Sequence, residues 1–206
     1  MSQAQRTPVV PLEAGAGPDN PPCPACGEPL FGWIAARPSL RGAVSRCESC
    51  GLGVVGEPGS IDEALGELDR HGSAFLNRES FSAWLGGAGW AGLEPGSRYL
   101  FTVESARRLV ATRDQIVKSS RWAPGAGIAT MWQTLLNSVT FGRNVALGAL
   151  GKPTFAAKAD ERWQRRIDGL ISIVLAIPAL VLALPLELAG AALRRGSVLR
   201  LRLQLL

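Results

Sequence analysis

Residues 23–51, CPACGEPLFGWIAARPSLRGAVSRCESCG, hold all four cysteines of this 206-residue chain and set its predicted architecture. The cysteines form two C-x2-C pairs that twenty residues separate. Two thiolates at this spacing can bind one tetrahedral Zn²⁺ from a tight turn, and a second pair completes a shell of four sulfurs. The sequence therefore predicts a structural zinc site with four ligands: Cys23, Cys26, Cys47 and Cys50.

A glycine follows the second cysteine of each pair, at Gly27 and Gly51. Glycine at this position permits the left-handed turn that points backbone amides at the sulfurs. The link between the pairs contains FGWIAA, residues 31–36, which can supply the strands of a hairpin. We therefore predict a zinc ribbon over residues 23–56, whose closed site folds the module and does no chemistry. Two disulfides, a redox pair and unliganded thiols are the alternatives.

The overall composition indicates a membrane segment, because the chain is 47% hydrophobic and only 19% charged, against about a quarter charged in a soluble domain. Residues 1–22 are rich in Pro, Gly and Ala and contain no apolar signal sequence, which predicts a disordered leader. Without an export signal the expected setting is the reducing cytosol, where disulfides are disfavoured.

The predicted membrane segment lies toward the C-terminus. Residues 169–186, GLISIVLAIPALVLALPL, carry no charge, and about 20 apolar residues are needed to cross the hydrocarbon core. Arginines that can reach lipid headgroups flank both ends. We predict a membrane-associated helix over residues 166–195, although Pro178 and Pro185 each remove a backbone donor and kink a plain span. A kinked helix in one leaflet and a buried core helix are the alternatives.

Residues 196–206 form a basic tail that ends in the alternating sequence VLRLRLQLL. Its leucines fall on one face and its arginines on the other, and a period of two is typical of a half-buried strand. We predict a strand at the edge of a sheet, with a headgroup-binding tail as the competing interpretation.

Residues 57–165 form a mixed region of short amphipathic segments that glycine and proline interrupt. Ser60 and Thr102 are each placed to cap a helix. The predicted elements are helices over 61–70, 79–85 and 103–119, a strand over 99–101, and a helical segment over 128–150 that Gly142, Asn144 and Gly148 interrupt. The expected fold class is α+β: a small zinc ribbon, a mostly helical remainder with a few short strands, and a long apolar C-terminal helix.

Residues 87–92, GAGWAG, match the G-x-G-x-x-G pattern of loops that hold nucleotide cofactors. Such a loop follows a strand and opens a helix, whereas the preceding ESFSAWL is helical in character and residues 93–96 break any helix. We interpret the segment as a flexible connector.

Other signs of catalysis are weak. His71 is expected to be a solvated loop or helix-capping residue, because no partner that would make it a general base is apparent. Four tryptophans of the mixed region are expected to be core or interfacial anchors: Trp84, Trp90, Trp122 and Trp132. The sequence contains no complete cofactor-binding or catalytic constellation that we recognise, which favours a non-catalytic protein.

Two groups of residues together resemble a known family. Residues 47–53, Pro58 and residues 61–65 resemble the zinc-binding start of certain bacterial class I S-adenosylmethionine-dependent methyltransferases. Residues 90–95 and 98–105 resemble a later part of the same enzymes, where a tryptophan-containing stretch leads to a strand and then to a helix that opens in a Phe-Thr-x-Glu-Ser type sequence.

The resemblance implies a shortened member that lacks the cofactor-binding half. Fewer than forty residues separate Leu52 from Trp90, whereas a single βαβ unit needs about thirty and the family's complete half needs several. Arg98 and Tyr99 stand where the family commonly has a histidine. No catalytic residue of the family can therefore be carried over to this chain.

These observations predict a non-catalytic, membrane-associated zinc-ribbon protein that binds a protein partner or acts as a scaffold. A methyltransferase fragment that works with a separate cofactor-binding chain is the first alternative. A nucleic-acid-binding zinc ribbon is the second, which the net charge of +5 and the arginines at 37, 41 and 46 favour, but the ribbon lacks interleaved aromatic residues. We expect a membrane location with the zinc module in the cytoplasm, or alternatively a soluble cytoplasmic protein.

Overall fold

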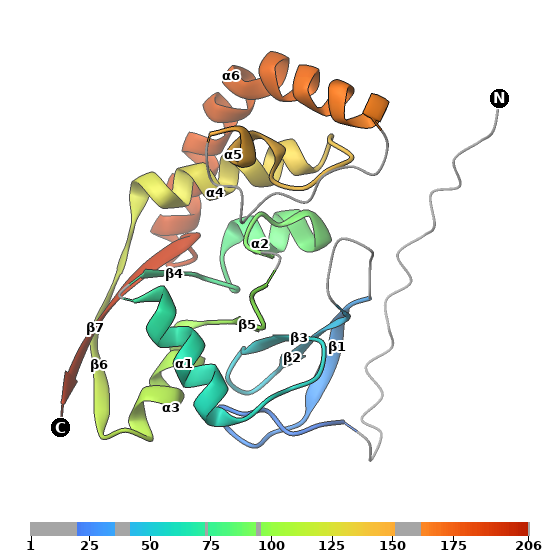
Figure 1. Cartoon of the computed structure of the whole chain (residues 1–206). Helices are drawn as coiled ribbons and strands as arrows, with labels where there is room; N and C mark the ends of the chain where they lie inside the picture. The colour runs from blue at the N-terminus through green and yellow to red at the C-terminus, as the bar shows by residue number, and fades with distance from the viewer. Residues whose placement is uncertain (1–19, 36–41, 73, 94–95, 151–161, 206) are drawn as a thin grey trace.

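The computed structural model of the protein describes residues 20–35, 42–72, 74–93, 96–150 and 162–205. Two antiparallel sheets and a group of helices make up the fold (Figure 1). Helices account for 48% and strands for 21%, which confirms the predicted mixture of helix and sheet with one long apolar C-terminal helix. Most of the predicted leader lies outside the described residues, as do Arg37 and Arg41.

The first sheet has the strand order β1-β2-β3-β5, with β1 at Leu30–Ile34, β2 at Val44–Cys47, β3 at Gly53–Val55 and β5 at Tyr99–Leu100. β1 and β2 form the hairpin predicted for the link, with Leu30 opposite Cys47. β3 pairs with β5 and places Val54 opposite Tyr99. Strand pairing thus continues past residue 56 and joins the cysteine module to the mixed region.

Two capped helices pack against this sheet: α1 at Ile61–His71 and α3 at Val103–Ala111. Ser60 Oγ accepts a 3.2 Å hydrogen bond from the backbone N–H of Glu63, and Thr102 forms a capping box with Ser105. Both predicted helix starts are confirmed, because the capping side chains satisfy donors that the first turn leaves unpaired. Their apolar faces share one core with the module, including Leu52, Val54, Ala64, Leu68, Phe101 and Leu109.

The predicted helix over 103–119 is wrong beyond Ala111. The chain turns there, Asp114 has a φ of 54°, and strand β6 follows at Gln115–Trp122. Ile116 and Val117 happen to continue the helical spacing of the apolar residues, but β-branched side chains also suit a strand. The partner strand, β7, lies about 80 residues later in the chain, so the local pattern could not reveal the pairing.

The second sheet has the order β4-β7-β6, with β4 at Ala74–Leu76 and β7 at Val198–Leu205. The predicted C-terminal strand is present, but its predicted place at a sheet edge is wrong, since β7 is the central strand. Leu199 lies opposite both Phe75 of β4 and Trp122 of β6. Leu199 and Leu201 are buried as the alternation predicts, whereas Leu203 is 46% exposed where β7 extends past β4.

The remaining helices are α2 at Phe81–Gly86, the short 3-10 helix η1 at Gly87–Gly89, α4 at Pro124–Asn137, α5 at Val145–Ala149 and α6 at Arg162–Ala192. The interrupted helical segment predicted over 128–150 corresponds to α4 and α5. α4 begins four residues earlier, and the interruption falls at Gly142 and Asn144 as predicted, with Asn144 at a φ of 52°, whereas Gly148 lies within α5. α2 corresponds to the helix predicted over 79–85 and begins after its cap, Ser80. α6 keeps both prolines inside one helix.

α6 lies along the outer side of α4 and α5 and then bends toward the second sheet (Figure 1). Trp132 of α4 donates a 2.8 Å hydrogen bond from Nε1 to the carbonyl oxygen of Ala176 in α6. Small side chains, Ala179 and Ala183, are buried at this contact and let the two helices approach closely.

Candidate metal centre

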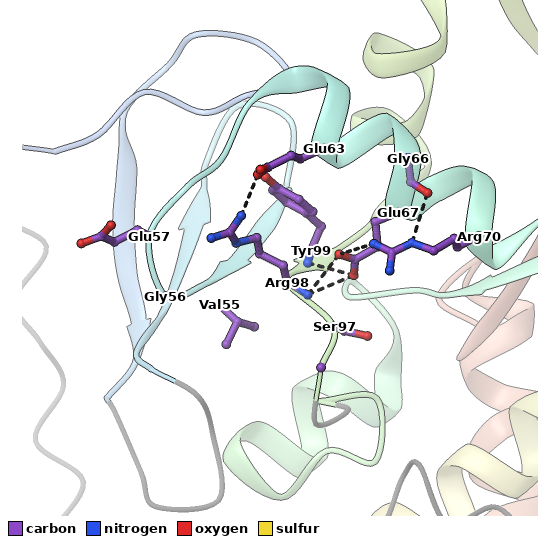
Figure 2. Close-up of a pocket in the computed structure, with 11 residues that line it drawn as sticks. Val55, Gly56, Glu57, Glu63, Gly66, Glu67, Arg70, Ser97, Arg98 and Tyr99 are labelled. Atoms are coloured by element: carbon purple, nitrogen blue, oxygen red, sulfur yellow. Dashed lines mark hydrogen bonds and ion pairs between the residues drawn. The ribbon is translucent and has the colours of Figure 1, made fainter.

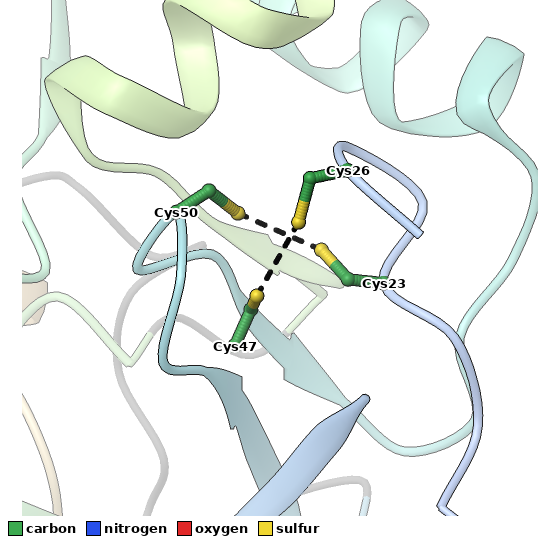
Figure 3. A group of neighbouring side chains, drawn as sticks. All are labelled: Cys23, Cys26, Cys47 and Cys50. Carbon is green, nitrogen blue, oxygen red and sulfur yellow. Dashed lines mark hydrogen bonds between the residues drawn. The ribbon is translucent and has the colours of Figure 1, made fainter. Parts of the chain in front are cut away.

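The four predicted ligands come together in the structure. The Sγ atoms of Cys23, Cys26, Cys47 and Cys50 lie within 4.8 Å of one another and point toward a common centre (Figure 3). The Cys23–Cys50 sulfurs are 3.6 Å apart and the Cys26–Cys47 sulfurs 3.5 Å apart. Four cysteines in this arrangement can hold a metal ion.

The geometry fits a tetrahedral ion better than it fits disulfides. Zn–S bonds of about 2.3 Å place the sulfurs of a tetrahedral site about 3.8 Å apart, whereas a disulfide requires about 2.05 Å. All four cysteines are free thiols, and three of them, Cys23, Cys47 and Cys50, are almost fully buried. The donor set therefore suits a soft divalent cation in a closed shell that leaves no position open to a substrate.

Two tight turns present the sulfurs. The backbone N–H of Gly27 donates to the carbonyl of Cys23 at 2.8 Å, and that of Gly51 donates to the carbonyl of Cys47 at 3.0 Å. Both glycines are left-handed, with φ values of 77° and 74°, as the sequence predicts. A Cβ at Gly51 would also meet Thr102 Cγ2 at 2.8 Å, so this position requires glycine for space as well as for conformation.

Two of the four thiols, Cys26 and Cys50, have a raised pKa. Burial raises the pKa of Cys26. A hydrogen bond with the Cys23 sulfur and burial raise the pKa of Cys50 well above its ordinary value. Four sulfurs this close cannot all carry charge unless a cation compensates them, which is the role that a bound metal ion fills.

Two residues of the mixed region donate hydrogen bonds to the second cysteine turn. Arg78 donates from Nε to the carbonyl oxygen of Gly51 at 2.5 Å, and its guanidinium lies 4.9 Å from the ring centre of Trp33. Thr102 Oγ1 donates to the carbonyl oxygen of Cys50 at 2.7 Å. No local sequence signal identifies Arg78, because only folding brings it to the turn, whereas the sequence predicts Thr102 solely as a helix cap.

Burial lowers the pKa of Arg78, although arginine remains a cation at neutral pH. A shell of four thiolates around a divalent ion carries a net negative charge. A partly buried guanidinium beside the Cys47–Gly51 turn would offset part of that charge, so Arg78 could support a bound ion.

His71 is the last residue of α1 and not a solvated loop residue. Its ring packs edge-on against Phe101, with centroids 6.0 Å apart, and Nε2 lies 4.0 Å from the Glu67 carboxylate. Burial lowers the pKa of His71, so the neutral imidazole is favoured in the folded protein. The prediction of a capping position is close, but the predicted solvation is wrong.

An open cavity of about 680 Å³ lies between α1 and the start of β5 (Figure 2). Glu67 accepts hydrogen bonds from the backbone N–H groups of Arg98 at 3.0 Å and Tyr99 at 3.2 Å. Arg98 also pairs with Glu63, at 2.6 Å. The backbone hydrogen bonds to Glu67 and the Arg98–Glu63 ion pair therefore connect β5 to α1.

The GAGWAG segment follows α2, a helix, and not the strand that a cofactor loop requires. Trp90 is fully buried and donates from Nε1 to Ser82 Oγ at 3.2 Å. Asn137 donates to the carbonyl oxygen of Gly89 at 2.9 Å, and Arg143 donates to that of Trp90 at 2.6 Å. These contacts fasten the segment between α2 and α4, which does not fit the flexibility that the sequence suggested.

The other three tryptophans differ in their surroundings. Trp122 and Trp132 are partly buried and hydrogen-bond to α6, as expected of anchors. Trp84 is 70% exposed and stacks on Phe81 with ring centroids 5.4 Å apart, so it does not belong to the core.

α6 is the one helix, within the described part of the chain, that is long and apolar enough to cross a membrane. Its most apolar 18-residue window has a mean hydropathy of 2.5 and is 17% buried in the protein. Ile173 is 77% exposed and Ile177 is 74% exposed. A core helix of a soluble protein can share this length and composition, but it would bury these side chains.

Comparison with protein-family models, curated proteins and solved structures found no match to this chain. The resemblance to methyltransferases therefore stays a prediction from the residues quoted above. The metal centre and α6 are the features of the structure that bear on the function.

Proposed function

We propose that this protein is a non-catalytic, membrane-attached zinc-ribbon protein that holds a partner protein at the membrane surface. The observation that carries the proposal is the outward face of α6, where apolar side chains are exposed along most of the helix. The proposed ion is Zn²⁺, because it favours four thiolates in tetrahedral geometry. The proposed zinc ribbon comprises residues 23–56.

The exposed apolar face is too large for an ordinary soluble surface. Its exposed side chains include Leu170, Ile173, Val174, Ile177, Leu180, Val181, Leu184 and Leu188. Contiguous apolar patches of more than a few hundred Å² on a soluble monomer mark sites of protein or membrane contact. Flanking arginines at both ends suit the headgroup region of a bilayer, so lipid is the proposed partner of this face.

The metal centre supports a structural role for the ion. A shell of four protein ligands, three of them buried, would stabilise the fold of the module, and its filled coordination sphere would leave no site for a reacting water. The module would then be a rigid surface for a partner protein, presented in the cytoplasm, where the thiols remain reduced until metal binds.

The first alternative is a methyltransferase fragment that completes its site with a separate cofactor-binding chain. It is supported by the resemblance over residues 90–95 and 98–105, which include the buried Trp90 and the β5–α3 connection. Binding of S-adenosylmethionine, or methyl transfer by the purified chain, would favour this alternative over the proposal.

The nucleic-acid-binding alternative receives less support. Arg46 is paired with Glu48 at 3.4 Å, so a carboxylate already offsets the charge of this arginine. A steep decrease in DNA or RNA affinity with rising salt concentration would promote the alternative.

Membrane attachment can be tested with the full chain, loaded with zinc and purified in detergent. After the detergent is removed in the presence of phospholipid vesicles, we expect the protein to float with the vesicles and to resist extraction by carbonate. A chain that stays monomeric and soluble without detergent or lipid would contradict the proposal.

A further inference from the structure

We infer that α6 lies in the plane of the membrane surface, within one leaflet and against anionic headgroups, and does not cross the bilayer. This inference rests on the membrane attachment proposed above and specifies its geometry. Both ends of α6 would then stay on the same side of the membrane as the metal centre.

Strand pairing around α6 gives the first reason. β7 follows α6 in the chain, yet it pairs with β6 along most of its length and with β4 at its start, and both of these strands precede α6. A single crossing would place β7 on the opposite side of the bilayer from its two partners. The sheet can therefore form only if α6 returns to the side on which it began.

A membrane-crossing hairpin of α4 and α6 does not resolve this conflict. α4 has 14 residues, whereas a crossing needs about 20. The far end of α4 also contacts irregular backbone, since Asn137 donates to the carbonyl oxygen of Gly89 and accepts from the N–H of Asn144. Loops of this kind are not exposed to lipid within the hydrocarbon region.

The inner face of α6 is attached to the protein at both ends. Asp168 accepts 2.8 Å hydrogen bonds from the backbone N–H groups of Phe141 and Gly142. Glu187, 19 residues further along, accepts from Trp122 Nε1 and from the N–H of Ser197. About 28 Å of helical rise separates these carboxylates, so the protein flanks the whole apolar segment and lipid can reach only one side of it.

The two prolines fit this placement. Pro178 and Pro185 are exposed, and α6 bends around α4 and α5 (Figure 1). A proline removes the hydrogen bond to the carbonyl four residues earlier, which here belongs to Val174 and Val181 on the exposed face. Unpaired carbonyls are costly in the bilayer centre but can be hydrated near the headgroups.

The ends of α6 supply the charge that recognises the lipid. Arg162, Arg165 and Arg166 are exposed at one end, and Arg194 and Arg195 are exposed at the other. Near the first group, Trp163 is 50% exposed and packs against Phe141 with centroids 5.5 Å apart. Basic residues at both ends of an in-plane helix favour an anionic phospholipid, and exposed tryptophan suits the interface between water and acyl chains.

The side of the membrane occupied by each end can be measured in bacterial cells with fusions to the full chain. Green fluorescent protein fluoresces in the cytoplasm, whereas alkaline phosphatase is active only after export. We expect fluorescence from either end and no phosphatase activity from either end. Fluorescence at one end together with phosphatase activity at the other would overturn the inference.

Lipid recognition can be measured with the purified protein and vesicles of phosphatidylcholine, with or without phosphatidylglycerol. We expect the protein to bind the vesicles that contain phosphatidylglycerol at least roughly tenfold more tightly than those of phosphatidylcholine alone, because each basic residue near an anionic surface strengthens binding. Equal binding to both vesicles would overturn the headgroup assignment.

Ile173→Asn and Ile177→Asn should each weaken vesicle binding by roughly tenfold or more, because these side chains would enter the acyl region. Ile116→Asn is the matched control on β6, at a position that is 41% exposed and far from α6 in the sheet. Equal losses in all three variants would overturn the placement. If the wild-type protein binds no vesicles, the proposed membrane attachment itself is wrong. If the protein binds but its two ends lie on opposite sides of the membrane, only the in-plane inference is wrong.

Discussion

Trp122 donates a 2.9 Å hydrogen bond from Nε1 to Oε1 of Glu187, across 65 residues of sequence. Glu187 is fully buried within the apolar helix α6, and it also accepts hydrogen bonds from the backbone N–H and the hydroxyl of Ser197. Ser197 continues the network to Ser82, which accepts from Trp90. An acidic residue in an apolar helix is explained by this network, which joins α6, the second sheet and α2.

Glu187→Ala should therefore lower the free energy of unfolding by about 3 kcal/mol, because it leaves several buried donors without an acceptor. Glu104→Ala, at an exposed helical position, should cost about 0.5 kcal/mol or less. Urea denaturation of the zinc-loaded protein in matched detergent measures both. Equal costs for the two variants would show that the network contributes little.

Gly127→Ala tests the space around the same carboxylate. A Cβ at Gly127 would clash with Glu187 Oε1 and lie 2.7 Å from Trp122 Nε1, whereas a Cβ at Gly125 would meet nothing within 4 Å. We expect Gly127→Ala to destabilise the protein by about 1–3 kcal/mol. Gly125→Ala, in the same helix, should be neutral or stabilising by up to about 1 kcal/mol. Thermal unfolding measures the stability of both variants. A Gly127→Ala variant as stable as the wild type would contradict the close contact.

Cys47→Ser should abolish stoichiometric zinc binding, because it removes a fully buried ligand from a shell of four. The wild-type chain should contain about one zinc ion, in keeping with one tetrahedral site. Ser49→Ala lies within the same turn and should retain the metal. Elemental analysis of the purified proteins measures the content, and wild-type protein without metal would refute the zinc assignment.

Arg78→Lys should weaken zinc affinity by roughly 10- to 100-fold, the range found when outer-shell partners of a metal site are changed. Lysine keeps the charge but cannot combine a guanidinium contact over the Trp33 ring with the Nε hydrogen bond to Gly51. Arg113→Lys is the matched control, because Arg113 is exposed and pairs with Asp69 at 2.7 Å. Competition with a chromophoric chelator measures both affinities, and unchanged affinity in Arg78→Lys would remove Arg78 from the centre.

His71 should make stability fall as the pH is lowered. Burial depresses its pKa below the ordinary value of 6.5, so the unfolded chain binds more protons than the folded one between the two pKa values. The contribution is therefore complete above pH 6.5 and is lost as the pH falls toward the folded-state pKa. The difference in unfolding free energy between wild type and His71→Gln, measured from pH 7.5 to 5, isolates this group from the acid sensitivity of the cysteines. A difference that does not change with pH would refute the burial of the imidazole.

The sequence predicts correctly those parts of the fold that depend on interactions between residues close together in the chain. The spacing of the cysteines identified the cluster, and Ser60 and Thr102 identified the starts of α1 and α3. In each case the residues that interact lie a few positions apart, or form pairs with a recognisable spacing. The sequence pattern and the structure then report the same local geometry.

The errors fall where distant segments meet. Residues 115–119 were assigned to a helix because their apolar spacing suits either structure, and only β7 decides for a strand. β7 was placed at an edge because its two neighbours, β4 and β6, cannot be identified from its own alternation. Nothing near Glu187 in the apolar segment indicates that its carboxylate is buried or that it accepts hydrogen bonds from Trp122 and Ser197. Arg78 likewise reaches the cysteine turn only through tertiary structure.

The central position of β7 also sets an order for synthesis on the ribosome. β4 and β6 are made first, but the strand that separates and joins them is made only after α6. Contacts between residues so distant in sequence form slowly, and strand edges stay unpaired in the meantime. Because α6 precedes β7 in the chain, the outward face of α6 leaves the ribosome before the strand that closes the second sheet.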